Sequence, residues 1–183
     1  MGVITKKTKG EKPRVEELVR RAQRGDAEAF AQLIEQNKKG LYAAARAVLH
    51  SDEDAADAMQ DAVLQGWQKL PRLAQPAFFK TWMTRILLYR CYDMLRRRRR
   101  TVPLEEAAQA AGAPHGGERL EVADALAHLA QSDRLVLTMF YWQDLPTRQI
   151  AQTLGVSEAA VRTRLARARK RFKQQWQEKE DAI

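Results

Sequence analysis

The residues best suited to binding a polyanion lie near the end of the chain, in residues 154–173. At 100° per residue, Val161, Leu165, Ala168 and Phe172 fall on one narrow apolar stripe, which predicts a helix that packs this face on a core. Basic side chains lie on its two shoulders, Arg162, Arg169 and Lys173 on one and Arg164, Arg167 and Arg171 on the other. Because the opposite crest carries small residues only, such a helix can enter a DNA major groove while its flanks reach phosphates.

The residues just before this helix predict a tight turn. Gly155 can adopt the left-handed conformation that ends a helix, and Ser157 can cap the next one. Glu158 places a negative charge in the first turn, where the helix dipole favours it. A short helix with Ile150 on its apolar face precedes the turn. The pattern is that of a helix-turn-helix whose second helix recognises DNA.

A second candidate site is an acidic stripe in residues 51–70. Ser51 or Asp52 can cap a helix there, and Pro71 ends it. Polar residues line one side of this helix, namely Asp54, Asp57, Asp61, Gln65 and Gln68. The stripe fits a solvated helix face, a carboxylate metal site or a docking surface for a basic partner. A metal site needs ligands from a second element, and no His- or Glu-rich segment supplies them, so we expect neither metal nor cofactor.

The third candidate site combines aromatic and basic residues. A predicted helix over residues 78–95 is apolar almost all round and runs into five consecutive arginines, residues 96–100. Its aromatic residues are Phe78, Phe79, Trp82, Tyr89 and Tyr92. Core packing explains most of these rings, and the arginine run alone fits a solubilising helix end or a linker. Exposed rings beside a basic run are, however, what single-stranded nucleic acid needs, since bases stack on rings and cations hold the backbone.

Size and composition limit the classes of protein to consider. The chain has 183 residues and a formal net charge of +9, which favours a polyanionic partner. Its one cysteine, Cys91, excludes an intramolecular disulfide framework, and its three histidines have no metal-binding spacing. No stretch approaches the length of a membrane span, and the first residues have no apolar signal core. We therefore expect a cytoplasmic protein without membrane insertion.

The predicted elements that position these sites are all helical, because no segment alternates with period two. Residues 1–14 are basic and poor in large apolar side chains, so we expect a disordered tail. Residues 101–118 are rich in Pro, Gly and Ala and predict a flexible linker. The sequence thus predicts an all-α protein with two small helical domains, at residues 15–100 and 119–178.

Taken together, these segments resemble the sigma factors of bacterial RNA polymerase, specifically the short extracytoplasmic-function (ECF) group. Residues 52–61 resemble the acidic segment of the family's region 2. Residues 79–86, continuing through residues 92–97, resemble its downstream promoter-recognition helix. Residues 150–157 and 161–169 resemble its region 4 helix-turn-helix. The resemblance covers nearly the whole chain, and the three segments occur in the family's order.

The resemblance implies a function and site residues. It implies a non-enzymatic initiation factor that binds core RNA polymerase, directs it to promoters and helps open the downstream (−10) element. The residues implied to dock on core polymerase are Asp54, Asp57, Asp61 and Gln65. Those implied to capture the −10 strand, beside a base-holding loop at residues 73–78, are Phe78, Lys80, Trp82, Arg85, Arg96 and Arg97. Those implied to bind the upstream (−35) DNA are Arg148, Ser157, Arg162, Thr163, Arg164, Arg167, Arg169, Lys170 and Arg171. Family members are commonly held inactive by an anti-sigma factor, which the resemblance implies as a partner.

Two departures from the family pattern bear on base preference. The chain has Pro146-Thr147-Arg148-Gln149 where many members have a capping serine and glutamates, and Tyr89 where asparagine is common. Two other functions are compatible with single segments. An autonomous dimeric helix-turn-helix regulator with a sensor half needs neither the acidic stripe nor the arginine run. A carboxylate-metal nuclease would depend on Asp54, Asp57 and Asp61 alone.

Overall fold

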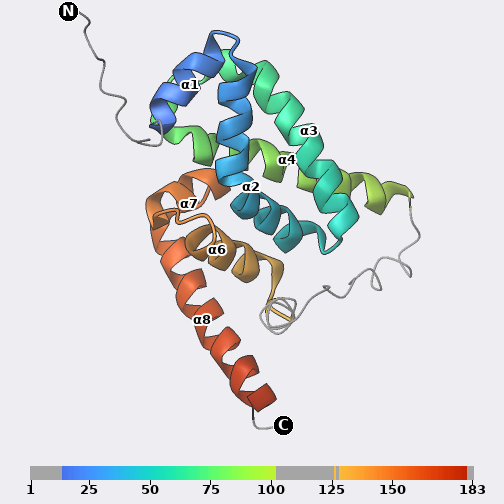
Figure 1. Cartoon of the computed structure of the whole chain (residues 1–183). Helices are drawn as coiled ribbons and strands as arrows, with labels where there is room; N and C mark the ends of the chain where they lie inside the picture. The colour runs from blue at the N-terminus through green and yellow to red at the C-terminus, as the bar shows by residue number, and fades with distance from the viewer. Residues whose placement is uncertain (1–13, 102–125, 127, 181–183) are drawn as a thin grey trace, which may run out of the picture.

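The protein folds into helices arranged in two halves (Figure 1). The structure is a computed structural model that describes residues 14–101, 126 and 128–180. The first half contains α1 (Val15–Gln23), α2 (Ala27–Leu49), α3 (Asp52–Lys69), α4 (Phe79–Thr101) and two short 3-10 turns, Leu70–Arg72 and Pro76–Phe78. The second half contains α6 (Gln131–Tyr141), α7 (Thr147–Leu154) and α8 (Glu158–Glu180).

The predicted all-α class is confirmed, since the described residues form helices and turns and contain no strand. The predicted tail (to residue 13), residues 102–118 of the predicted linker, and residues 119–125 lie outside the described residues. Thr101, which we assigned to the linker, is the last residue of α4.

Local signals in the sequence explain where the first helices begin. Gly25 has a φ of +97° and ends the turn after α1, and the Asp26 side chain then accepts a hydrogen bond from the Ala29 amide at 3.0 Å. This bond is the main reason that the pKa of Asp26 is lowered. Ser51 caps α3 in the same way, accepting from the Asp54 amide at 3.2 Å.

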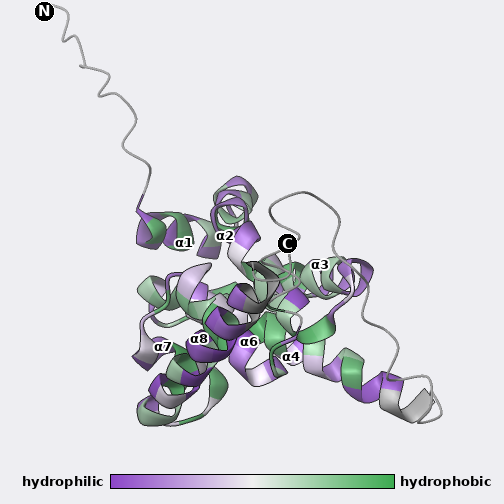
Figure 2. Cartoon of the chain, turned by 90° about the horizontal axis from the view of Figure 1, so that it is seen from below, coloured by the Kyte–Doolittle hydropathy of each residue, from purple (hydrophilic) through white to green (hydrophobic). Residues whose placement is uncertain are grey.

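The core of the first half lies between α2, α3 and α4, with α1 packed on α2. Phe30 contacts both Trp67 and Phe79, with ring centroids 5.2 and 6.3 Å apart. Gly66 lets α4 approach α3 closely, because a Cβ there would lie 2.8 Å from the sulfur of Met83. Figure 2 shows hydrophilic and hydrophobic residues alternating along α1, as expected for a helix with one face on a core.

The second half forms the predicted helix-turn-helix. Gly155 ends α7 with a φ of +67°, and Ser157 caps α8 by accepting from the Ala160 amide at 3.1 Å. The predicted apolar stripe of α8 is confirmed, because Val161, Leu165 and Ala168 are buried.

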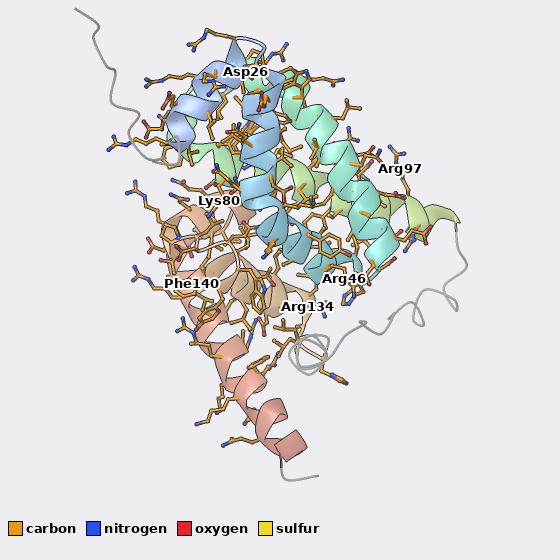
Figure 3. The ribbon with its side chains drawn as sticks, viewed as in Figure 1. Asp26, Arg46, Lys80, Arg97, Arg134 and Phe140 are labelled. Carbon is orange, nitrogen blue, oxygen red and sulfur yellow. The ribbon has the colours of Figure 1, made fainter. Side chains whose placement is uncertain are left out.

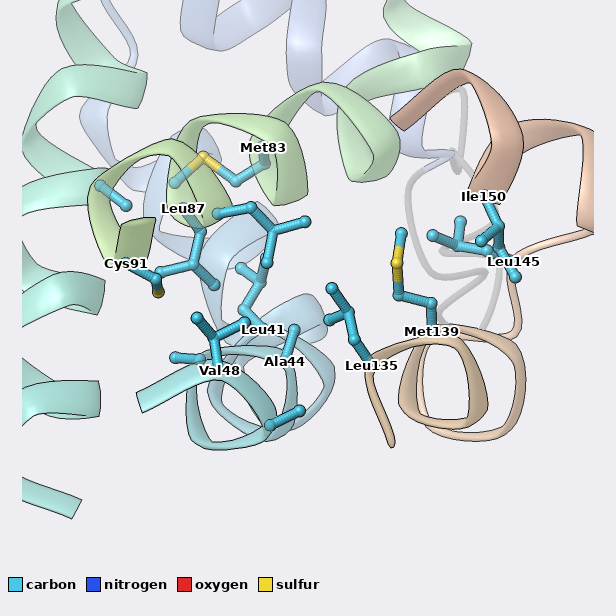
Figure 4. Close-up of a cluster of buried hydrophobic side chains, with 14 of the residues drawn as sticks. Leu41, Ala44, Val48, Met83, Leu87, Cys91, Leu135, Met139, Leu145 and Ile150 are labelled. Atoms are coloured by element: carbon cyan, nitrogen blue, oxygen red, sulfur yellow. The ribbon is translucent and has the colours of Figure 1, made fainter. Parts of the chain in front are cut away.

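The two halves also pack on each other, which the prediction of two linked domains did not include. Helix α6 lies between α2 and α8, and residues 133–139 are all buried. Leu135 and Met139 of α6 join Leu41 and Val48 of α2 in one apolar cluster (Figure 4). Full burial of such side chains stabilises by about 1.5–3 kcal/mol each. The second half is therefore held on the first by a hydrophobic core.

Candidate nucleic-acid and docking surfaces

Helix α3, which carries the acidic stripe, packs on α2 and α4 (Figure 1). Asp57 and Asp61 are exposed and lie four residues apart, so they share one helix face. Gln65 continues that face and is half-buried. This face offers two carboxylates and an amide to a basic partner.

Asp54 is placed differently from its predicted neighbours. Its side chain is only 9% exposed, and its Oδ1 accepts a hydrogen bond from the Arg98 guanidinium at 2.6 Å. The ion pair ties the start of α3 to the end of α4. In this arrangement Asp54 holds the first half together and is not available on the acidic surface.

The structure adds Leu64 to the acidic surface. This side chain is 60% exposed, although it is large and apolar. It lies three residues after Asp61 and so on the same face of α3. An apolar residue at a polar position of the stripe was a signal in the sequence that we did not use. Leu64 gives the surface an apolar contact beside Asp61, beyond its two charges.

The start of α4 forms an open cavity of about 510 Å³. Phe78, Trp82 and Arg85, three of the predicted strand-capture residues, line it. The other lining residues are Arg72, Leu73, Ala74, Gln75, Thr81 and Gln152. Phe78 is 38% exposed, Trp82 is half-buried and Arg85 is exposed. Rings and guanidinium groups thus surround a hollow beside the predicted base-holding loop.

Two cations at this end of α4 are bound by the second half. The Lys80 ammonium donates to the backbone carbonyl of Gln143 at 2.7 Å, and Arg85 donates to the carbonyl of Gln152 at 2.8 Å. Figure 3 shows Lys80 where the first half meets α7. Lys80 is half-buried by this contact, whereas Arg85 remains exposed beside the cavity.

Arg96 and Arg97 do not join the cavity, because they lie at least 11 residues, about 16 Å along the helix axis, beyond Arg85. Both pair with Asp93, at 2.6 and 2.9 Å. The hydrogen bond from Arg96 is the main reason that the pKa of Asp93 is lowered. Both guanidinium groups remain largely exposed, so they can still contact a phosphate backbone.

On the recognition helix, the predicted base-reading residues lie near the N-terminus of α8. Thr163 is exposed, while Arg164 is half-buried. Arg162 is exposed and pairs with Glu158 at 2.7 Å. Ser157 is exposed and caps the helix, and Arg148 is exposed on α7.

Glu158 links the two helices of the motif. It accepts from the Thr147 hydroxyl at 2.6 Å, and this bond, followed by the one from Arg162, lowers its pKa. The departure from the family pattern at Pro146-Thr147 therefore changes how the start of α7 is held. Pro146 precedes α7 without a side-chain cap, and Thr147 instead bonds to the start of α8.

Two of the predicted phosphate-binding arginines have an internal partner. Asp133 of α6 is fully buried, and Arg167 donates to both of its oxygens, at 2.5 and 2.9 Å. Arg171 donates to the same carboxylate at 3.2 Å. The bond to Asp133 raises the pKa of Arg167. Their side chains are still about half exposed, so they orient α8 on α6 while reaching its surface.

Arg169 is held by aromatic rings, and Lys170 is exposed beside it. The Arg169 guanidinium lies 5.2 Å from the centroid of Phe140 and 5.6 Å from that of Tyr141, and it donates to the Tyr141 hydroxyl at 2.9 Å. Lys170 has no such contact with a ring among the described residues and is exposed. Sequence reasoning missed Asp133 and Tyr141, because only the fold brings them to α8.

Other chemistry has little support in the described part of the chain. It contains no group of three His, Cys, Asp or Glu residues that could hold a metal ion, and no helix long and apolar enough to cross a membrane. Cys91 is buried, and burial raises the pKa of its thiol to about 12. A thiol in this state is protonated and unreactive at neutral pH.

Comparisons with known proteins match both halves. A family model described as Sigma-70 region 2 matches residues 33–101, and one described as Sigma-70, region 4 matches residues 119–172. The ECF RNA polymerase sigma factor SigM of Mycobacterium tuberculosis is 34% identical over 151 residues, covering 81% of this chain and 77% of SigM. RNA polymerase sigma factor CnrH of Cupriavidus metallidurans is 30% identical over 171 residues, covering 83% and 88%.

Solved structures agree with these matches. A structure of CnrH in complex with the cytosolic domain of CnrY has a TM-score of 0.65 at 28% identity, covering 87% of this chain and 94% of CnrH. A structure of the sigma factor RpoE with the anti-sigma factor NepR from Bartonella quintana has a TM-score of 0.69 at 21% identity, covering 82% and 98%, and shows the shared fold. The chain therefore belongs to the sigma-70 family, in its ECF group, and is an alternative sigma factor that directs RNA polymerase to promoters.

Proposed function

We propose that three surfaces of this sigma factor divide the work of initiation. The exposed face of α3 docks on core RNA polymerase, the cavity at the start of α4 captures the melted −10 strand, and the N-terminal part of α8 reads the −35 element. Residues 15–100 and 119–178 act as the two promoter-reading domains. The chain itself catalyses no reaction and works in the cytoplasm, where the polymerase makes the phosphodiester bonds.

One observation carries the proposal: aromatic and cationic side chains surround the cavity beside the 3-10 turns that precede α4. A base taken out of a duplex costs a few kcal/mol in lost stacking and pairing. Stacking on an aromatic ring returns about 1–3 kcal/mol per base. Trp82 and Phe78 supply such rings, and Arg72 and Arg85 supply charge for the backbone. The cavity can thus stabilise an opened strand without covalent chemistry.

The docking surface on α3 combines Asp57, Asp61 and Gln65 with the exposed Leu64. The two carboxylates steer a partner of opposite charge, and Leu64 at the end of their row adds an apolar contact. The complementary partner is a basic surface of core polymerase that also offers an apolar contact. Asp54 supports this surface from below through Arg98.

We also propose an anti-sigma factor as a partner. The supporting observation is the RpoE structure, which contains the anti-sigma factor NepR. The rival function, an autonomous dimeric regulator, is not favoured, because the matched family works with RNA polymerase.

Binding to purified core polymerase tests the docking surface. Asp57→Lys combined with Asp61→Lys should weaken binding of the full chain at least about tenfold, because like charges then face each other. Glu35→Lys is the matched control. Glu35 is an exposed acid of α2, and its pair with Lys38 at 3.4 Å contributes little. Equal binding by the double variant and the control would contradict the docking assignment.

A further inference from the structure

The loop between α3 and α4, residues 70–78, borders the strand-capture cavity. The cavity residues that it contributes are Arg72, Leu73, Ala74, Gln75 and Phe78. Within its two 3-10 turns, the Leu73 amide donates to the Leu70 carbonyl and the Phe78 amide to the Gln75 carbonyl, both at 3.0 Å. Leu73 and Gln75, which join the turns, have extended backbones with ψ of +101° and +99°. An extended segment has no hydrogen-bond partners within itself, so other elements must hold it in place.

Gln23, the last residue of α1, bonds to this loop from outside. Its side-chain amide donates to the Leu73 carbonyl at 2.8 Å and to the Leu70 carbonyl at 3.1 Å. A primary amide has two N–H donors, and both partners here are acceptors, so its full donor capacity is used. The partners lie 47 and 50 positions after Gln23 in the chain. One side chain thus fixes both ends of the first 3-10 turn.

The end of α1 is itself held by several contacts. Leu18 and Val19 pack α1 on the core and are fully buried. In the turn that follows α1, the Asp26 carboxylate pairs with Arg21 at 2.7 Å, and Figure 3 shows Asp26 at this turn. Helix α1 also contacts both 3-10 turns of the loop. Gln23 therefore ties the loop to an element whose position is already fixed.

The bond to Leu73 determines where the exposed part of the loop lies. The Leu73 side chain is buried, whereas Ala74 and Gln75 after it are exposed and line the cavity. A buried side chain and a bound carbonyl thus hold Leu73 from two sides. Ordering a mobile loop costs conformational entropy, and a loop already ordered in its binding conformation spares the ligand that cost. A fixed loop should therefore hold an unpaired base more tightly than a mobile one.

We propose that Gln23 is a positioning residue for strand capture. It orders the loop through the Leu70 and Leu73 carbonyls before DNA arrives, and not through a contact of its own with DNA. Its effect should be confined to the opened −10 strand, because the docking face of α3 and the recognition helix α8 belong to other surfaces. The inference rests on the proposed function, in which the cavity beside this loop holds the melted strand.

Gln23→Met and Gln23→Lys separate the two hydrogen bonds from simple packing. Methionine has a similar length but no N–H donor, whereas lysine keeps donors on a side chain of similar reach. If Gln23 only filled space, methionine would be tolerated at least as well as lysine. Gln32→Met is the matched control, because Gln32 is also half-buried and lies on α2.

Amide hydrogen exchange in the free full chain tests the positioning alone. Gln23→Met should speed exchange of the Leu73 and Phe78 amides about tenfold, because the loop opens more easily without the two bonds. Gln23→Lys and Gln32→Met should leave these amides within about twofold of the wild type. Unchanged exchange in Gln23→Met would overturn the proposal.

Strand capture is measured with core polymerase carrying the full chain. The affinity for a forked promoter with a single-stranded −10 element should fall about 5- to 30-fold with Gln23→Met and recover with Gln23→Lys. The affinities for core polymerase and for a duplex with only the −35 element should stay unchanged. Equal losses in all three affinities would show a general folding defect, and lysine no better than methionine would show a packing role. Either result would contradict the proposal.

Trp82→Ala in the same assay separates failure of this inference from failure of the proposed function. Faster loop exchange in Gln23→Met with unchanged affinity for the forked promoter would overturn the inference. If Trp82→Ala then weakens binding to the fork, the cavity still captures the strand and the proposed function stands. If Trp82→Ala also has no effect, the cavity does not capture the strand and the proposed function fails as well.

Discussion

The amide of Gln143 donates a hydrogen bond to the backbone carbonyl of Gly40, 103 positions earlier in the chain, at 2.9 Å. Both residues are buried, so the bond lies inside the interface between the two halves. A buried polar group left without a partner costs about 1–3 kcal/mol, and therefore this contact selects one arrangement of the halves over others. Thr84 satisfies the other end of the same amide.

A pH effect should arise at the opposite end of this interface. His50 ends α2 with a φ of +63°, and its Nε2 lies 2.5 Å from Nη2 of Arg134. Burial, and then the charges of Arg134 and Arg46, lower the pKa of His50 from 6.5. Arg46 in turn pairs with Asp52 at 2.8 Å. Because the Arg134 guanidinium can only donate, its contact with Nε2 favours neutral His50.

The sign of the effect follows from this lowered pKa. As the pH falls, His50 takes up its proton first in the unfolded chain. The stabilisation that neutral His50 contributes is therefore fully present above pH 6.5 and is lost as the pH falls through the folded pKa. Urea unfolding at about pH 7.5 and about pH 5.5 measures it. His50→Asn, which tolerates the positive φ, should show a smaller decrease in unfolding free energy on acidification. An identical decrease in the two proteins would contradict the assignment.

Asp133→Asn should destabilise the second half. It removes the charge that Arg167 and Arg171 share, and because both arginines are about half exposed, we expect a loss of about 1–3 kcal/mol. The control is Glu158→Gln, which changes a partly exposed acid of α8 that pairs with Arg162. Urea unfolding compares the two. A loss from Glu158→Gln as large as that from Asp133→Asn would contradict the role given to burial.

The helices and their caps could be predicted from the sequence, because their signals are local. Ser51, Ser157 and Gly155 occupy the caps and the turn expected of them, and Val161, Leu165 and Ala168 of the apolar stripe of α8 are buried as predicted. Gly40 does not end a helix, and α2 continues through it. This glycine instead makes room for Gln143, which is far away in the sequence.

The partners of the charged residues could not be predicted in the same way. Periodicity puts Asp54 on the acidic face, but the end of α4 brings Arg98 to it, 44 positions away. Arg171 has the spacing of a phosphate-binding side chain, yet α6 places a buried carboxylate beside it. The packing of the second half on the first depends on α6, whose apolar residues occur all round the helix and do not indicate two separate neighbours.

Two variants should distinguish the residue of α8 that reads bases from the residue that binds phosphate. Arg164→Ala should change the preference among −35 sequences, because a bidentate arginine–guanine contact discriminates by about 1–3 kcal/mol. Lys170→Ala should weaken binding evenly and lower the salt dependence by about one charge. Lys170 is the better phosphate probe than Arg171, which is bound to Asp133. Polymerase binding to a set of promoter variants measures both; parallel losses on every sequence would contradict the assignment.

Strand capture should depend on the ring of Trp82. Trp82→Ala should reduce promoter opening about 5- to 150-fold, corresponding to about 1–3 kcal/mol for one stacked base. Trp82→Phe keeps a ring and should retain most of the opening. A fluorescent base analogue in the −10 element reports opening by polymerase carrying the full chain. Equal opening with the two variants would show that stacking on this residue does not contribute.

Transcription from genomic fragments by core polymerase, with and without the chain, tests the central claim most directly. We predict new discrete start sites with the wild type, and their loss when Asp57 and Asp61 are both changed to lysine. Tight binding of the free chain to a palindrome, with no new start site when polymerase is added, would contradict the claim.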